Sequence, residues 1–93
     1  MQYQSSKGFE KILRRLHPNE KMEVQRNVDA LVRAFEARSV PIGAGLKKLS
    51  GHLWEFRISL ALRVLFEWEK NIVTFLFIGN HNEVQQFLRQ YIG

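Results

Sequence analysis

Two arginines and one histidine are the residues of this 93-residue sequence whose types and spacing suit a chemical reaction. Arg57 and Arg63 lie in neighbouring segments of alternating polarity, and His81 follows a glycine after the next apolar segment. An arginine fork can bind two phosphate oxygens at once, and histidine readily accepts or donates a proton near neutral pH. The combination suits cleavage of a phosphodiester by a neighbouring 2′-hydroxyl, which needs proton transfer and positive charge on the phosphate.

Metal chemistry is not expected. The three histidines, His17, His52 and His81, show no ligand spacing, no pair of carboxylates accompanies them, and the sequence has no cysteine. The sequence therefore predicts neither a bound metal nor another cofactor.

Consecutive strands must position the arginines. Residues 53–59 and 62–69 alternate between apolar and polar side chains, and residues 72–78 are apolar on both faces. Two registers pair apolar with apolar residues, and they place Arg57 either directly across from Arg63 or diagonal to it. Like charges that face each other on a sheet are destabilising, which favours a site that holds an anion between them.

The third strand should bring the histidine to the same place. A turn at residues 70–71 gives a register that puts Arg63 opposite Ile78, and Gly79 then ends the strand. We therefore expect His81 to emerge beside Arg63. Three apolar side chains should share the arginine face, namely Leu65, Leu76 and Ile78. Together with the exposed N-terminal helical hairpin, they should offer a surface to a partner segment.

Helical periodicity surrounds these strands. A first helix should follow Ser5 or Ser6, either of which can cap it, and a second should begin at Pro18. An apolar stripe from Val84 onward predicts a short C-terminal helix with Asn82 as its N-cap.

The expected fold class is α+β, in a single domain of residues 1–93. It consists of a small antiparallel sheet of three to four strands, the extra strand lying at residues 2–4. The N-terminal helical hairpin covers one face of the sheet, and the short C-terminal helix follows the last strand.

The charge balance indicates a polyanionic partner. The sequence carries a net charge of +5 and has a pI near 10.0, and its surplus of bases lies in residues 1–16 and 41–64. Lys47 and Lys48 fall in the second of these regions, in an expected loop. No apolar run is long enough to span a membrane and no signal segment opens the sequence, so a cytoplasmic protein is expected.

The order of these elements and several short motifs resemble the RelE/ParE toxins of bacterial toxin–antitoxin pairs. The motifs are Leu46-Lys47-Lys48-Leu49-Ser50-Gly51, Trp54-Glu55-Phe56-Arg57-Ile58, Arg63-Val64-Leu65-Phe66 and Gly79-Asn80-His81-Asn82-Glu83-Val84. Each motif is short, and it is their order and spacing together that carry the resemblance over most of the chain. The resemblance implies a RelE-like fold, a concave basic face that binds RNA, and a cognate antitoxin as partner.

For a toxin similar to RelE, the resemblance implies metal-independent cleavage of mRNA in the ribosomal decoding site, with the 2′-hydroxyl as nucleophile. Arg63 matches the arginine that stabilises the transition-state phosphate, and His81 occupies the acid–base corner. The phosphate-binding positions correspond to Lys47, Lys48 and Arg57.

Alternatives remain open. A ParE-like toxin would inhibit DNA gyrase by binding alone, and a basic module would only bind RNA or a partner. The histidine after the last strand favours a nuclease over a gyrase inhibitor. Many RelE-like members have a tyrosine early in the last helix, where this chain has Gln85 and Gln86, and this departure keeps the non-catalytic module open. For Arg63, the alternative to phosphate binding is an ion pair with Glu55 or Glu67.

Overall fold

The structure is a computed structural model that describes residues 1–43 and 45–92. No helix in these ranges is long and apolar enough to cross a membrane. The described residues form eight elements: β1 (Gln2–Ser5), α1 (Lys7–Arg15), α2 (Pro18–Glu36), β2 (Leu46–Ser50), β3 (Leu53–Arg57), β4 (Arg63–Glu69), β5 (Ile72–Gly79) and α3 (His81–Ile92).

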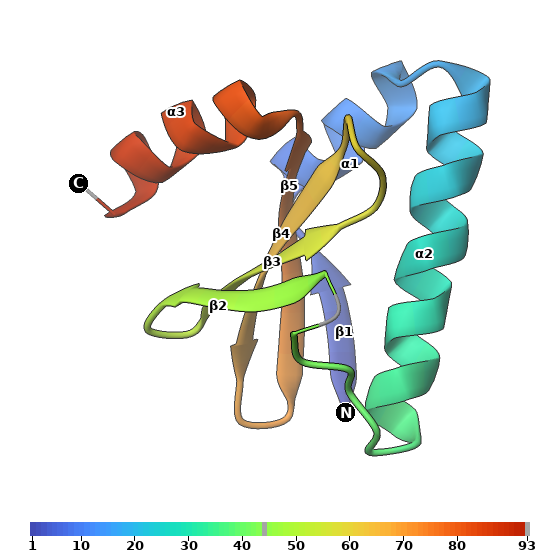
Figure 1. The fold of residues 1–93 in the computed structure, drawn as a ribbon, viewed down its shortest axis with the longest axis vertical. Coiled ribbons are helices and arrows are strands. Elements are labelled where there is room, and N and C mark those ends of the chain that lie inside the picture. The colour runs from blue at the N-terminus through green and yellow to red at the C-terminus, as the bar shows by residue number, and fades with distance from the viewer. Residues whose placement is uncertain (44, 93) are drawn as a thin grey trace.

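The strands form one sheet in the order β1-β5-β4-β3-β2, with α2 on one side and α3 extending from the other (Figure 1). This arrangement confirms the predicted α+β class, with five strands where three to four were expected. The predicted strand at residues 2–4 is β1, which pairs with β5 in parallel. The strand that was not predicted is β2. It contains Lys47 and Lys48, which were expected to lie in a loop.

The face of the sheet under α1 and α2 holds the main hydrophobic core. Of the two predicted N-caps of α1, Ser5 and Ser6, the structure has Ser6, whose Oγ atom accepts a hydrogen bond of 3.0 Å from the backbone N–H of Phe9. Burial of a side chain such as Phe66, which is fully buried, stabilises the fold by about 1.5–3 kcal/mol. The buried members of this core are Phe9, Val24, Leu31, Phe35, Leu46, Leu62, Val64, Phe66, Val73, Phe75 and Ile78.

A β-bulge in β5 changes the predicted register. Phe66 pairs with Phe75, but Leu65 pairs with Phe77, so Leu76 is an extra residue without a partner on β4. Beyond the bulge the alternation of side chains is shifted by one position. Ile78 therefore lies in the core under the helices and not on the arginine face, which corrects the sequence prediction.

The same bulge places Gly79, not Ile78, opposite Arg63. A Cβ atom at Gly79 would lie 2.7 Å from Cε2 of Phe77 and 2.9 Å from Cβ of Glu83, so the close approach of α3 requires glycine. The chain turns directly from this residue into α3.

A capping box that starts at Asn80 holds the beginning of α3. The Asn80 Oδ1 atom accepts a hydrogen bond of 2.9 Å from the Glu83 N–H, and the Glu83 Oε1 atom accepts one of 2.8 Å from the Asn80 N–H. The N-cap is thus Asn80, and the prediction of Asn82 was wrong by two positions. Val84 then packs with Leu53 and Leu65 in a second core on the other face of the sheet.

Candidate functional site

The pairing of β3 with β4 places Arg57 directly across from Arg63, the first of the two predicted registers. The residues next to them, Phe56 and Val64, belong to the core under the helices. Because side chains alternate along a strand, both arginines project from the opposite face, which we call the arginine face. Arg57 is exposed, whereas Arg63 is largely covered.

Glu55 lies beside this pair. Its Oε1 atom is 3.7 Å from Nε of Arg63, and the two side chains are only 11% and 12% exposed, respectively. The ion pair proposed from sequence as the structural alternative therefore exists, and Glu55 is its acidic partner. This distance is too long for a hydrogen bond, and the pair does not form the two parallel bonds of a bidentate arginine–carboxylate contact. The attraction between the two side chains is therefore electrostatic.

The two lysines of β2 lie on different faces of the sheet. Lys47 pairs with Glu55, whereas Lys48 pairs with Trp54, whose side chain packs against the core under the helices. Consecutive residues of a strand point to opposite faces, so Lys47 belongs to the arginine face and Lys48 does not. Of the two lysines that the sequence prediction grouped together, the structure thus brings only Lys47 to the arginines.

A small pocket opens on the arginine face between β2 and β3. Its volume is about 250 Å³, and Glu55 lines it together with the cations Lys47 and Arg57. Its other lining residues are Gly43, Gly45 and Leu46. The pocket therefore presents two positive side chains and one carboxylate to a ligand.

His81 begins α3 at the end of the sheet that holds the two arginines. Since Gly79 pairs with Arg63, His81 follows two residues beyond that pair, and the β3–β4 turn lies at the same end of the sheet (Figure 1). Within the described part of the chain, no hydrogen bond or ion pair joins the exposed His81 side chain to another residue.

Gln85 and Gln86 occupy the next turn of α3, and both are exposed. The tyrosine of α3 is Tyr91, near the other end of the helix. Its hydroxyl donates a hydrogen bond to Oε2 of Glu67 on β4. Burial, and then the contact with Glu67, raise the pKa of Tyr91 to about 12.

The contact between Tyr91 and Glu67 was not predicted from the sequence. The ring of Phe87 stacks on Phe77 at 4.6 Å between centroids and on Tyr91 at 5.4 Å. The spacing of Phe87 and Tyr91, four residues apart in a helix, was the available signal for one side of this stack. The Glu67 partner depends on how α3 sits on the sheet, which no local pattern encodes.

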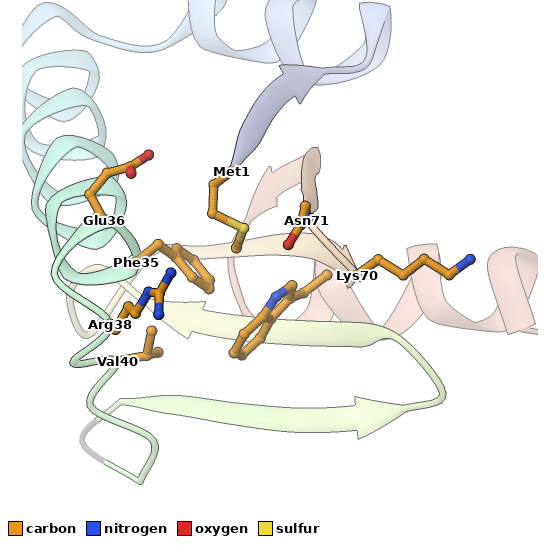
Figure 2. Close-up of a pocket in the computed structure, with 8 residues that line it drawn as sticks. Met1, Phe35, Glu36, Arg38, Val40, Lys70 and Asn71 are labelled. Atoms are coloured by element: carbon orange, nitrogen blue, oxygen red, sulfur yellow. The ribbon is translucent and has the colours of Figure 1, made fainter.

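A larger pocket, of about 520 Å³, lies at the opposite end of the sheet, beside the β4–β5 turn. Its aromatic lining residues are Phe35 and Trp68, whose rings meet edge to face at 4.7 Å between centroids. Figure 2 shows that Lys70 extends away from Arg38, so these two cations do not converge on one anion. The arginine face is therefore the better candidate for phosphate binding.

Residues 1–43 and 45–92 contain no group of three His, Cys, Asp or Glu side chains that could hold a metal ion. Comparison with known proteins gives a match in fold and none in sequence. The sequence matches no protein-family model and no curated protein. Its fold, however, matches several solved structures.

A chain of the RelB–RelE antitoxin–toxin complex from Methanococcus jannaschii superimposes with a TM-score of 0.66 at 11% identity, over 94% of this chain and 98% of that one. The archaeal RelE–RelB complex from Pyrococcus horikoshii gives 0.64 at 21% identity, over 85% and 92%. A copper-bound mutant toxin from Helicobacter pylori gives 0.64 at 14% identity, over 90% and 98%. The chain has a RelE-like fold.

The RelE-like fold confirms the resemblance that the motifs of the sequence indicated. At identities of 11% to 21%, the match establishes the architecture and not the roles of single residues. The roles of Arg63 and His81 in catalysis, and of Lys47, Lys48 and Arg57 in RNA binding, therefore stay predictions.

Proposed function

We propose that this chain is the toxin of a type II toxin–antitoxin pair and that it stops translation by cutting mRNA in the ribosomal decoding site. Two structural neighbours are complexes of RelE with RelB, and a third is a toxin. This shared fold supports the toxin role. The proposed site of action is the cytoplasm, where ribosomes translate mRNA.

The observation that carries the nuclease proposal is the gathering of cations at one end of the arginine face. Arg57 lies directly across from Arg63, and Lys47 shares their face. An RNA phosphate would meet the exposed Arg57, and the charge of its transition state would be stabilised there. His81, exposed at the start of α3, would donate a proton to the leaving oxygen.

The proposal needs no metal ion, because the 2′-hydroxyl of the RNA is the nucleophile and the arginines supply the positive charge. Gln85 and Gln86 stand where many RelE-like members have a tyrosine, and a glutamine side chain does not serve as a proton donor to the leaving oxygen. His81 is therefore the proposed proton donor in this chain.

A cognate antitoxin is the proposed protein partner. The surface predicted for it on the arginine face is not available, since Leu65 is fully buried and Ile78 lies in the core under the helices. The helical hairpin was the other part of the predicted surface, and it has a pocket of about 270 Å³ between α1 and α2. Its apolar lining consists of Phe9, Leu13, Val24 and Val28. An apolar segment of the antitoxin would cover this surface.

The test is expression without antitoxin, followed by mapping of mRNA ends and by cleavage assays with purified ribosomes. We expect growth arrest and cut mRNA with 5′-hydroxyl ends for the wild-type chain. His81→Ala should lower the cleavage rate by about 10²-fold. His52→Ala is the matched control, because His52 is also exposed but pairs with Glu69, away from the arginines.

Each alternative function gives a different result. Growth arrest with intact mRNA and damaged DNA would identify a gyrase inhibitor. Absence of growth arrest, with RNA or protein binding retained, would identify a non-catalytic module. Either outcome would contradict the nuclease proposal.

A further inference from the structure

Glu55 is a nearly buried carboxylate surrounded by cations. Its residue is 9% exposed, the only buried charged residue in the described part of the chain. The cations that face it from its own and the neighbouring strands are Lys47 on β2, Arg57 on β3 and Arg63 on β4, and one acidic residue of the same face, Glu67 on β4, lies diagonal to it. These elements hold the carboxylate in a defined position.

A carboxylate in this place has a cost that calls for an explanation. Burial of a charge is unfavourable, and a negative group beside a phosphate weakens the binding of RNA. Neutralisation of Arg63 explains part of the arrangement. It does not explain why Glu55 also lines the pocket of about 250 Å³ with Lys47 and Arg57, where a ligand meets all three side chains.

Cleavage by a 2′-hydroxyl needs a group for each of two proton transfers. His81, at the end of the arginine face, suits the transfer to the leaving oxygen, and the exposed Gln85 and Gln86 cannot accept a proton from the nucleophile. Glu55 has the required chemistry, because a carboxylate accepts a proton. The cations around it would attract the phosphate, and the 2′-hydroxyl lies on the ribose bonded to that phosphate.

We propose that Glu55 is the general base of the RNA cleavage assigned above, an inference that rests on the proposed function. The Glu55 carboxylate takes the proton of the 2′-hydroxyl, and the 2′-oxygen forms a bond to phosphorus. The bond between phosphorus and the 5′-oxygen breaks, and this oxygen takes a proton from His81. The products are a 2′,3′-cyclic phosphate and a 5′-hydroxyl, with Glu55 protonated and His81 deprotonated.

In this arrangement Arg63 positions the base. Its Nε atom, 3.7 Å from the carboxylate, holds Glu55 in place from the β4 side. Arg57 and Lys47, both exposed, are the cations that meet the phosphate first. The ion pair between Arg63 and Glu55 is therefore part of the site and not a sign that Arg63 is occupied elsewhere.

The test compares Glu55→Gln with Glu69→Gln in single-turnover cleavage of mRNA on programmed ribosomes. Glu69 is the matched control, because it lies on β4 with a basic side chain beside it, His52 at 3.8 Å, but its own side chain is 62% exposed. We expect Glu55→Gln to lower the rate by about 10²-fold or more, and Glu69→Gln to cleave as the wild type does. RNA with a 2′-deoxy sugar at the cut should bind Glu55→Gln as tightly as the wild type or more tightly, since a negative charge is removed.

A second variant and a pH profile separate catalysis from structure. Glu55→Asp keeps the charge but withdraws the carboxylate by one methylene, so its rate should fall at least tenfold while affinity is unchanged. If the carboxylate is the base, the pH–rate profile of the residual activity of Glu55→Gln should differ from that of the wild type on its acidic side. Glu55→Asp also serves as the test if Glu55→Gln does not fold.

Three outcomes would overturn the inference. If Glu55→Gln or a folded Glu55→Asp cleaves RNA at the wild-type rate, the proposed function stands and Glu55 is not the base. A parallel loss of rate, affinity and thermal stability in both variants, with an unchanged pH profile, would leave Glu55 only a structural role. A wild-type chain that cuts no RNA would overturn both proposals.

Discussion

The Nε atom of Arg63 lies 3.7 Å from the Oε1 atom of Glu55, and both side chains are almost completely covered. This pair joins β4 to β3 directly beside Arg57, which is exposed. One arginine of the facing pair is thus neutralised within the protein, and the other is available to a ligand. Arg63 therefore contributes to the stability of the sheet as well as to the proposed site.

Arg63→Ala should destabilise the fold, because it leaves the Glu55 carboxylate buried without its partner. We expect the free energy of unfolding to fall by about 3 kcal/mol, measured by urea denaturation. The double variant Glu55→Met with Arg63→Met should recover most of this loss, since two apolar side chains then replace the ion pair. An Arg63→Ala protein as stable as the wild type would show that water already solvates the pair.

Lys47 and Lys48 should differ in RNA binding although they are neighbours in the sequence. Lys47 lies on the arginine face and Lys48 on the other. Lys47→Ala should weaken RNA binding and reduce the slope of log affinity against log salt by about 1, whereas Lys48→Ala should change neither. Fluorescence anisotropy at several salt concentrations measures both quantities. Equal effects of the two substitutions would contradict the placement of the RNA on the arginine face.

Asn80→Ala should destabilise α3, since it removes the side-chain acceptor of the capping box with Glu83. The expected loss in the free energy of unfolding is about 1 kcal/mol. Asn82→Ala is the control, because Asn82 is exposed within the first turn and caps nothing. Thermal unfolding followed by circular dichroism distinguishes them. A larger effect at Asn82 would mean that α3 begins two residues later than described.

The contact of Tyr91 with Glu67 should make stability depend on alkaline pH. Burial and this contact raise the pKa of Tyr91 from 10.0 to about 12 in the folded state. A raised pKa favours the protonated tyrosine in the fold, so its stabilisation is complete below pH 10 and is lost as the pH rises toward about 12.

Ultraviolet absorbance of tyrosinate measures this titration. Tyr3 is the second tyrosine, and burial together with Glu36 raises its pKa to about 12 as well. Glu67→Gln should lower the pKa of Tyr91 alone, and Glu36→Gln that of Tyr3 alone. A wild-type tyrosine that ionises at its ordinary pKa would show that its hydrogen bond does not persist in solution.

The sequence by itself determined the features that depend on local periodicity. Alternation in residues 53–59 and 62–69 predicted which side chains face the core, and it limited the pairing of Arg57 with Arg63 to two registers, of which the structure has one. Helical spacing and the Ser6 cap predicted α1 in the same way. These predictions succeeded because the period of two in a strand and of 3.6 in a helix is a property of neighbouring residues.

Only the tertiary structure decided what depends on contacts between distant segments. The bulge at Leu76 places Ile78 on the face opposite to the predicted one. The sequence pattern of β5 does not predict this bulge, since both faces of the strand are apolar. The separation of Lys47 from Lys48 follows from the pairing of β2 with β3. The burial of Glu55 against Arg63 requires β2, β3 and β4 together, because a carboxylate is held in a covered position only where neighbouring strands supply the opposing charges.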